Sequence, residues 1–233
     1  MEPLAFQAYG VEFAVSVADR SVLAAALPPG ADAIAPRAGL ARFDDADGIE
    51  ALESALRTHV AGAAPDLVFV HAGVVAVDGR AIVVPGTTHA GKTTLVAELL
   101  RAGATYYSDE LAVLTADGRA LPYAKPLALR GEDGGRPRVQ AAELGAATGA
   151  GPAEVAIVAR TWFEAGAAWA PAERSAADGV LMLLAHTGQA RDAPERVLDA
   201  VRAATEGAVV LEGPRGEAAG VAADLLARAR RTP

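Results

Sequence analysis

The chain contains no cysteine, no asparagine and only two lysines, Lys92 and Lys125. The lack of cysteine excludes a thiolate nucleophile and a cysteine-ligated zinc site, and it is compatible with a reducing cytosol. The lack of asparagine argues against a guanine-specific switch, whose usual base-reading motif, Asn-Lys-x-Asp, requires that residue. The formal net charge is −8 and the arginines are scattered. Because binding to a phosphate backbone needs a clustered basic surface, we expect no nucleic-acid partner.

Long apolar runs are also absent. The first twenty residues lack a basic segment followed by an apolar one, and no run approaches the ~20 residues that would span a bilayer. The 233 residues are 52% hydrophobic and 21% charged, which is typical of a globular protein with a substantial core. We therefore expect a cytoplasmic protein with no membrane partner.

One octapeptide, Gly86 to Thr93, fits the phosphate-binding pattern G-x-x-x-x-G-K-[ST]. It lies between a strand-like stretch, Ala81 to Pro85, and a helix-like one, Thr94 to Ala102. Glycine lets the main chain curl so that backbone N–H groups converge on phosphate oxygens, and the helix directs its positive end at the anion. The pattern predicts a nucleotide site whose residues are Gly86, Thr87, Thr88, His89, Ala90, Gly91, Lys92, Thr93 and Thr94. Lys92 would contact the β and γ phosphates of ATP, and the Thr93 hydroxyl would contact Mg²⁺.

In the sequence, one predicted hairpin precedes this loop and another follows it. Asp78-Gly79 joins Leu67–Val77 to Arg80–Val84, and Asp117-Gly118 joins two further β-rich runs, Leu111 to Leu114 and Arg119 to Tyr123. The strand that enters the loop is therefore expected to be antiparallel to its predecessor. This pattern predicts an α/β fold with a mixed sheet, in which a hairpin feeds the phosphate-binding loop.

The rest of the chain predicts a small β/α extension, residues 1–65, packed on a loop-bearing domain, residues 66–233. In the extension, Ala5 to Val17 reads as strand, and Asp47 to Ala61 as a helix with Asp47 as its cap. Gly131 to Pro137 reads as a mobile loop and Ala141 to Pro152 as irregular chain. The last third is expected to contain strands at Glu154–Ala159 and Ala208–Leu211 and helices at Ser175–Ala185, Pro194–Thr205 and Gly216–Arg230.

An acidic pair, Asp109-Glu110, follows the helix after the loop. Mg²⁺ bound to a triphosphate needs a carboxylate near Lys92, and phosphoryl transfer to a hydroxyl benefits from a second carboxylate that accepts the proton. An isolated pair of acids would read as a solvated turn. Its place after the loop helix favours a role at the phosphates instead, with Asp109, Glu110 and Thr93 as candidate metal ligands.

A histidine that opens the first hairpin, His71, completes an arrangement that resembles the catalytic domain of the HPr kinase/phosphorylase family, whose P-loop fold is related to phosphoenolpyruvate carboxykinase. The match runs from Val70 to Leu114 and consists of His-Ala-Gly-Val-Val-Ala-Val, the loop, and Ser-Asp-Glu-Leu-Ala-Val-Leu. The resemblance implies ATP-dependent transfer of a phosphate to a serine hydroxyl. It also implies that Asp109 is the base, that Glu110 is associated with the metal, and that His71 is the active-site histidine. Lys125 and Arg130 are candidate phosphate contacts.

The chain departs from the family in three ways. The second acid is commonly aspartate, whereas this chain has Glu110. The roughly 65 residues before the hairpin are too few for the separate N-terminal domain of the full-length enzymes. The family's Arg-Gly-x-Gly loop is matched only in part, at Arg130-Gly131. HPr as the substrate, and phosphorolysis as a second reaction, therefore stay open. The acceptor could be a protein or peptide serine or a small hydroxylated molecule, and a homo-oligomer is considered because of the resemblance.

Two other classes of function compete with a kinase. One is an ATP-driven switch or ATPase that acts through a protein partner, and the other is a non-catalytic nucleotide-binding module. A hydrolase needs a group that positions water, whereas a kinase needs a base that faces an acceptor. Trp162, Phe163 and Trp169 could stack on a base, although core or interface positions are commoner for aromatics.

Overall fold

The structure, a computed structural model, describes residues 2–87, 90–131 and 135–232. The chain divides into two compact units, Met1–Leu67 and Val68–Pro233. No helix in these three ranges is long and apolar enough to cross a membrane. The predicted packing of the first unit on the second stays a prediction, and each unit is described by itself.

The first unit is a four-stranded sheet with a helix. The strands run in the order β3-β1-β2-β4, and Tyr9-Gly10 joins β1 to β2 with positive φ at both positions. The long helix α2 buries Leu52, Leu56 and Val60, a spacing that places all three on one face. Its N-cap is Gly48, so the prediction that Asp47 caps the helix is wrong. The elements are β1 (Leu4–Ala8), β2 (Val11–Ser16), α1 (Leu23–Ala26), β3 (Asp32–Ile34), β4 (Ala41–Asp44) and α2 (Ile49–Ala63).

The second unit is built on an eight-stranded sheet. Seven strands follow one another in the order β13-β14-β12-β6-β5-β8-β9, and the eighth, β7, pairs with β5. β12 lies between β6 and β14 and is parallel to both, whereas β5 is antiparallel to β6. The predicted mixed sheet is confirmed. Its longer strands are β5 (Val68–Val77), β6 (Arg80–Pro85), β7 (Thr105–Ser108), β8 (Leu111–Leu114), β12 (Glu154–Phe163) and β14 (Val209–Arg215). The short ones are β9 (Ala120–Leu121), β13 (Ala172–Arg174) and a separate pair, β10 (Leu127–Ala128) with β11 (Arg138–Val139).

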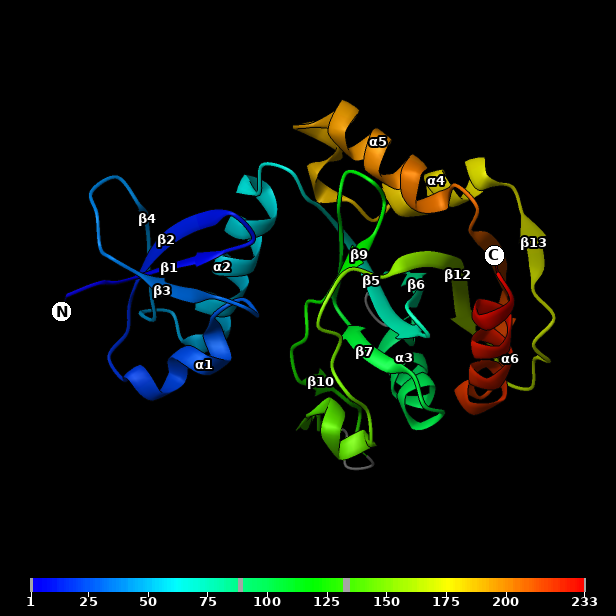
Figure 1. The fold of residues 1–233 in the computed structure, drawn as a ribbon. Helices are drawn as coiled ribbons and strands as arrows, with labels where there is room; N and C mark the ends of the chain where they lie inside the picture. Colours follow the sequence, from blue (N-terminus) through cyan, green and yellow to red (C-terminus); the bar gives the residue numbers. More distant parts are fainter. Residues whose placement is uncertain (1, 88–89, 132–134, 233) are drawn as a thin grey trace. The chain divides into compact units, whose positions relative to one another are not determined.

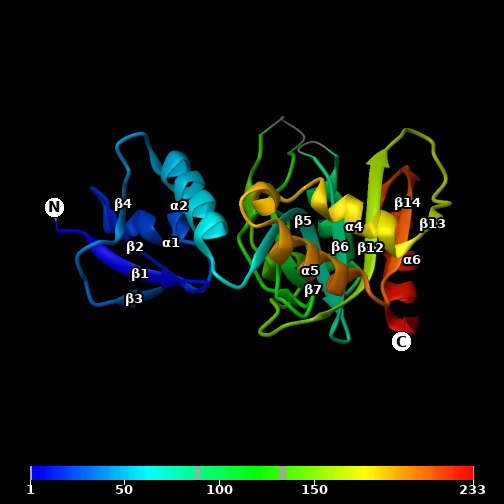
Figure 2. The ribbon, with the colours of Figure 1, turned by 90° about the horizontal axis from the view of Figure 1, so that it is seen from above.

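Helices cover both faces of this sheet (Figures 1 and 2). α3 (Lys92–Arg101) and α6 (Ala218–Arg231) pack on one face, and α4 (Ala176–Leu184) and α5 (Pro194–Thr205) pack on the other. Because successive side chains of a strand point to opposite faces, β5 contributes Val75 and Val77 to the first core and Val74 and Ala76 to the second. The sheet therefore packs against a pair of helices on each face, with one apolar core on either side.

The predicted hairpin before the loop is confirmed. Asp78 and Gly79 have φ values of 52° and 77°, as a two-residue turn between twisted strands requires. β5 pairs with β6 from Val77↔Arg80 to Ala72↔Pro85. The strand that leads into the loop is thus fixed along its length by its neighbour.

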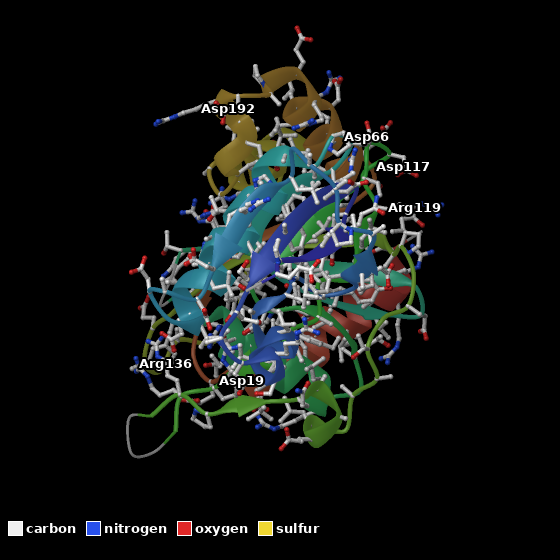
Figure 3. The ribbon with its side chains drawn as sticks, turned by 90° about the vertical axis from the view of Figure 1, so that its left-hand side faces the viewer. Asp19, Asp66, Asp117, Arg119, Arg136 and Asp192 are labelled. Atoms are coloured by element: carbon white, nitrogen blue, oxygen red, sulfur yellow. The ribbon has the colours of Figure 1, made fainter. Side chains whose placement is uncertain are left out.

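The second hairpin joins β8 to β9 and is shorter than predicted, because β9 has only two residues. Asp117 and Arg119 lie at the surface on its turn (Figure 3), with Arg119 Nε 3.5 Å from Asp117 Oδ2. Gly118 packs against α5, where an added Cβ would lie 2.3 Å from the Ala204 nitrogen. The turn therefore requires glycine both for its φ of +79° and for this close approach.

The helices of the last third begin and end close to the predicted residues. Ser175 caps α4 by accepting a hydrogen bond from the Asp178 N–H, and Pro194 opens α5. α6 begins at Ala218, two residues after the predicted start. The predicted irregular segment, Ala141 to Pro152, contains one short 3₁₀ turn, Ala141–Leu144. Residues 132–134 of the predicted loop lie outside the described residues.

Candidate nucleotide site

The loop leaves the buried end of β6 and enters α3. Gly86 is buried, and Gly91 is the N-cap of α3 in the left-handed conformation, with φ 80° and ψ 19°. The helix begins at Lys92, two residues before the predicted start at Thr94. Thr88 and His89 lie outside the described residues. The strand, loop and helix that a phosphate site requires follow one another in this order.

The ammonium group of Lys92 lies inside the loop. Its Nζ donates hydrogen bonds to the Gly86 and Thr87 carbonyl oxygens, each at 2.8 Å. Burial lowers the pKa of Lys92, while the negative charges of Asp109 and Glu110 act to raise it. The charge of Lys92 therefore interacts with both acids, although the helix that follows the loop lies between them in the sequence.

Ser108 shapes the turn that carries these acids. β7 ends at Ser108 and β8 begins at Leu111, which leaves Asp109 and Glu110 in the turn. The buried Ser108 hydroxyl accepts hydrogen bonds from the backbone N–H groups of Glu110, at 3.1 Å, and Leu111, at 2.9 Å. The Glu110 carbonyl in turn accepts from the Ala72 N–H at 3.2 Å. The turn is thus fixed by bonds within it and by a bond to β5.

Asp109 is the acid that meets the loop helix. Its carboxylate accepts hydrogen bonds from the Thr93 hydroxyl and, at 3.3 Å, from the Tyr106 hydroxyl. Burial and the neighbouring charge of Glu110 raise the pKa of Asp109 from 3.8 to about 6, against the two hydrogen bonds that lower it. A carboxylate with a pKa near the working pH can both exist ionised and accept a proton.

His71 lies at the loop end of β5. It is opposite Leu111 in β8, and its carbonyl oxygen is 3.5 Å from the Gly86 nitrogen, which donates to it. Alternation along β5 places its side chain on the face of Val75 and Val77, which α3 covers. The structure therefore brings His71 to the base of the loop, beside the turn that carries Asp109.

Lys125 and Arg130 have different surroundings. Lys125 is buried, and its carbonyl oxygen accepts a hydrogen bond of 2.7 Å from the Tyr106 hydroxyl that also contacts Asp109. Arg130 is exposed. Lys125 is thus connected to the site through its main chain, and a role for either side chain stays a prediction.

The residues around the loop fit Mg²⁺. The Thr93 hydroxyl and the carboxylates of Asp109 and Glu110 offer the hard oxygen donors that this ion prefers, with the remaining positions left for phosphates and water. Among the described residues, no cluster of three or more His, Cys, Asp or Glu side chains could hold a metal by itself.

No protein-family model matches the chain, and no curated protein matches its sequence. The fold is similar to a solved HPr(Ser) kinase/phosphatase. That structure, from Coxiella burnetii, is 15% identical to this chain, with a TM-score of 0.43. The match covers 70% of this chain and 95% of that one.

Three residues of the site have no local sequence signal. The first is Tyr106, which is 2% exposed and whose hydroxyl links Asp109 to the Lys125 carbonyl oxygen. The second residue is His186, after α4, whose carbonyl oxygen accepts a 2.8 Å hydrogen bond from the His71 N–H. Burial and the positive charges of Lys92 and Arg160 lower the pKa of His186. This pKa favours a neutral imidazole beside the lysine.

The third is Arg215, at the end of β14. It is 2% exposed, and its Nη2 donates a 2.9 Å hydrogen bond to the Gly91 carbonyl oxygen. The two residues are 124 positions apart in the sequence. Only the order of the strands brings them together.

The aromatic residues singled out in the sequence have different surroundings. The Trp169 indole donates a 2.9 Å hydrogen bond to Asp224 on α6 and is thus a structural residue. Trp162 and Phe163 are 39% and 54% exposed at the carboxyl end of β12. Neither contributes to the two buried cores.

Proposed function

We propose that the protein is an ATP-dependent kinase that transfers the γ-phosphate to a hydroxyl group. The observation that carries the proposal is the meeting of Thr93, Lys92 and Asp109: the last residues of the loop lie against a partly buried carboxylate of raised pKa. Phosphoryl transfer depends on positioning and charge neutralisation at the phosphates together with a group that accepts the proton of the acceptor. These three residues supply both requirements.

In the proposed reaction, the loop N–H groups and Lys92 hold the triphosphate. Lys92 exchanges its bonds to the Gly86 and Thr87 carbonyls for bonds to phosphate oxygens. The acceptor hydroxyl attacks the γ-phosphorus, a new P–O bond forms, and the bond from that phosphorus to the ADP oxygen breaks. The hydroxyl proton passes to the Asp109 carboxylate, whose pKa of about 6 suits this step near neutral pH.

Mg²⁺, when bound with the nucleotide, would neutralise charge on the phosphates. Thr93 and Glu110 would hold it from the protein side, and Asp109 stands close enough to share in that task. The raised pKa favours Asp109 as the proton acceptor. The two roles differ in their consequences, because a lost metal ligand weakens nucleotide binding whereas a lost base slows turnover.

His71 and His186 would assist the transfer without accepting the proton of the acceptor hydroxyl. The neutral imidazole favoured at His186 could contact a phosphate oxygen, and His71 would influence the protonation of Asp109. The acceptor is expected to be a serine of a protein or peptide, or a small hydroxylated molecule. Specificity of that kind resides in surface loops rather than in the phosphate site.

The test is incubation of the whole protein with γ-labelled ATP, Mg²⁺ and a lysate of its source cells, in water enriched in ¹⁸O. Transfer to an acceptor puts the label on a distinct protein, peptide or metabolite. Hydrolysis releases phosphate that carries one ¹⁸O atom from water. Asp109→Asn should stop transfer and leave ATP affinity, measured by calorimetry, within a few-fold of the original protein.

The control variant is Asp192→Asn. Asp192 is an exposed carboxylate just before α5 (Figure 3), and its replacement should change neither transfer nor affinity. Label found only as ¹⁸O-phosphate would replace the kinase with an ATPase, the alternative that acts through a protein partner. ATP binding with no turnover in any lysate would reduce the protein to a binding module. An equal loss of affinity and turnover in Asp109→Asn would reassign that residue from base to metal ligand.

A further inference from the structure

Arg215 is a charged side chain in an unusually apolar position. It is 2% exposed and lies at the last residue of β14, on the face of the sheet that α3 and α6 cover. Burial lowers the pKa of its guanidinium, and the charge of Glu217 offsets this only in part. No ion pair joins Arg215 to a carboxylate of the described residues. Removing a cation from water costs several kcal/mol unless hydrogen bonds and charges compensate.

The hydrogen bonds of Arg215 go to two peptide carbonyls. Nη2 donates to the Gly91 oxygen at 2.9 Å and Nη1 donates to the Gly216 oxygen at 3.0 Å. Nε is buried without a hydrogen-bond partner in the described structure. Gly91 is the N-cap of α3, and Gly216 lies just before α6. One guanidinium therefore fastens together the starts of both helices on this face of the sheet.

The Gly91 carbonyl is the important contact. This oxygen also accepts the first backbone hydrogen bond of α3, from the Leu95 N–H at 3.1 Å, so it receives two donors. In a trans peptide the C=O and the N–H point in opposite directions. The N–H of Lys92 belongs to the same peptide and is therefore directed away from Arg215, toward the inside of the loop. Fixing and polarising the carbonyl fixes and strengthens that N–H as a donor.

The fit at this contact is close. A Cβ added to Gly91 would lie 2.5 Å from Arg215 Nη2, and the φ of +80° at Gly91 would strain any other residue. The backbone conformation therefore requires glycine at this position, and a Cβ there would also displace the end of the Arg215 side chain. The guanidinium and the loop are complementary in shape.

We propose that Arg215 is a positioning residue that holds the Gly91-Lys92 peptide in its phosphate-binding orientation. This inference rests on the proposed nucleotide site and extends it to a residue from the far end of the chain. Arg215 does not touch the phosphates in this proposal. It acts through the peptide, so ADP and ATP should depend on it equally.

The first measurement is spectroscopic. Because Lys92 and Lys125 are the only lysines, ¹⁵N-lysine labelling gives one backbone amide signal for each. In the nucleotide-free protein, Arg215→Met should shift the Lys92 amide signal and leave the Lys125 signal in place. A variant that only loosened the fold would broaden or move both. Arg215→Lys keeps the charge but has a single ammonium for two carbonyls, so it should give an intermediate shift.

The second measurement is calorimetric titration with Mg·ADP and Mg·ATP well below the melting temperature of every variant. Loss of a charge-assisted hydrogen bond of ordinary strength predicts about 30-fold weaker binding of both nucleotides by Arg215→Met, and a smaller loss by Arg215→Lys. Arg228→Met is the matched control. It removes the ion pair of Arg228 with Asp224 on α6 without a contact to the loop, and should bind both nucleotides normally.

Two outcomes would overturn the inference. The first is a Lys92 amide signal that does not move in Arg215→Met, together with an Mg·ADP affinity within twofold of the original protein. The second is a loss of affinity confined to Mg·ATP, which would indicate direct contact of Arg215 with the γ-phosphate. If Arg215→Met fails to fold, Arg215→Lys decides by the same two readouts. If the original protein binds neither nucleotide, the proposed function fails first, and the Lys92 signal alone still tests the link between Arg215 and the loop.

Discussion

Asp109→Asn should make the nucleotide-free protein more stable at pH 8, although it removes a residue of the proposed active site. In the folded protein the Asp109 carboxylate is partly buried beside Glu110, and its pKa rises from 3.8 to about 6. The folded state therefore holds this proton more tightly than the unfolded state does. The stabilisation is fully present below about pH 4 and is lost as the pH rises through 6.

The size of the effect follows from the two pKa values. One pKa unit corresponds to 1.36 kcal/mol, so a rise from 3.8 to about 6 corresponds to about 3 kcal/mol of stability lost between pH 4 and pH 8. Asparagine does not titrate and keeps donors and acceptors of similar shape. The stability of the variant relative to the original protein should increase by about 3 kcal/mol over this range, or about 6 to 12 °C in Tm for a domain of this size.

Tryptophan fluorescence during urea unfolding is a suitable assay, because both tryptophans of the chain, Trp162 and Trp169, lie in the unit that contains Asp109. The free energy of unfolding is measured at steps from pH 4 to pH 8 for the original protein, Asp109→Asn and the exposed control Asp192→Asn. The control should follow the original protein throughout. A stability difference between Asp109→Asn and the original protein that does not change with pH would refute the reasoning, since the buried charge would then cost nothing.

Three further changes have defined consequences. Lys92→Ala should abolish binding of Mg·ATP in calorimetry while the far-UV circular dichroism stays unchanged, because among the described residues the ammonium group donates to two loop carbonyls. Retained affinity would remove Lys92 from the phosphate site. Tyr106→Phe deletes a hydrogen bond that lowers the pKa of Asp109, so the acid limb of the pH–rate profile should move to higher pH; an unmoved limb would contradict the assignment of Asp109 as base. Gly73→Ala would place a Cβ 2.6 Å from Val96 Cγ2 beneath α3, and it should lower the free energy of unfolding in urea by about 1 to 3 kcal/mol. An unchanged free energy of unfolding would show that α3 shifts to accept the methyl group.

The local features of the site follow from short stretches of sequence. Asp78-Gly79 predicts the hairpin because few other dipeptides adopt positive φ at two successive positions, and the structure has both. The glycines and Lys92 predict a loop between a strand and a helix, which is where they lie. Ser175 and Pro194 mark helix starts through hydrogen-bonding and φ preferences that act within a few residues. The one capping residue assigned wrongly, Asp47, loses its place to Gly48, where φ is +92°.

The tertiary structure decides which distant residues meet the loop. The sequence places Asp109 after the loop helix, but only the packing of β7 and β8 beside β5 brings its carboxylate to Thr93 and buries it enough to raise its pKa. Arg215 and His186 carry no motif, and they reach Gly91 and His71 because the sheet inserts β12 between β6 and β14 and because the chain after α4 pairs with β5. Strand order and burial depend on contacts between segments far apart in the chain, which local preferences of a single sequence do not contain. The sequence therefore determines the glycine-rich loop and its flanking elements, and the fold determines the charges and hydrogen bonds that surround it.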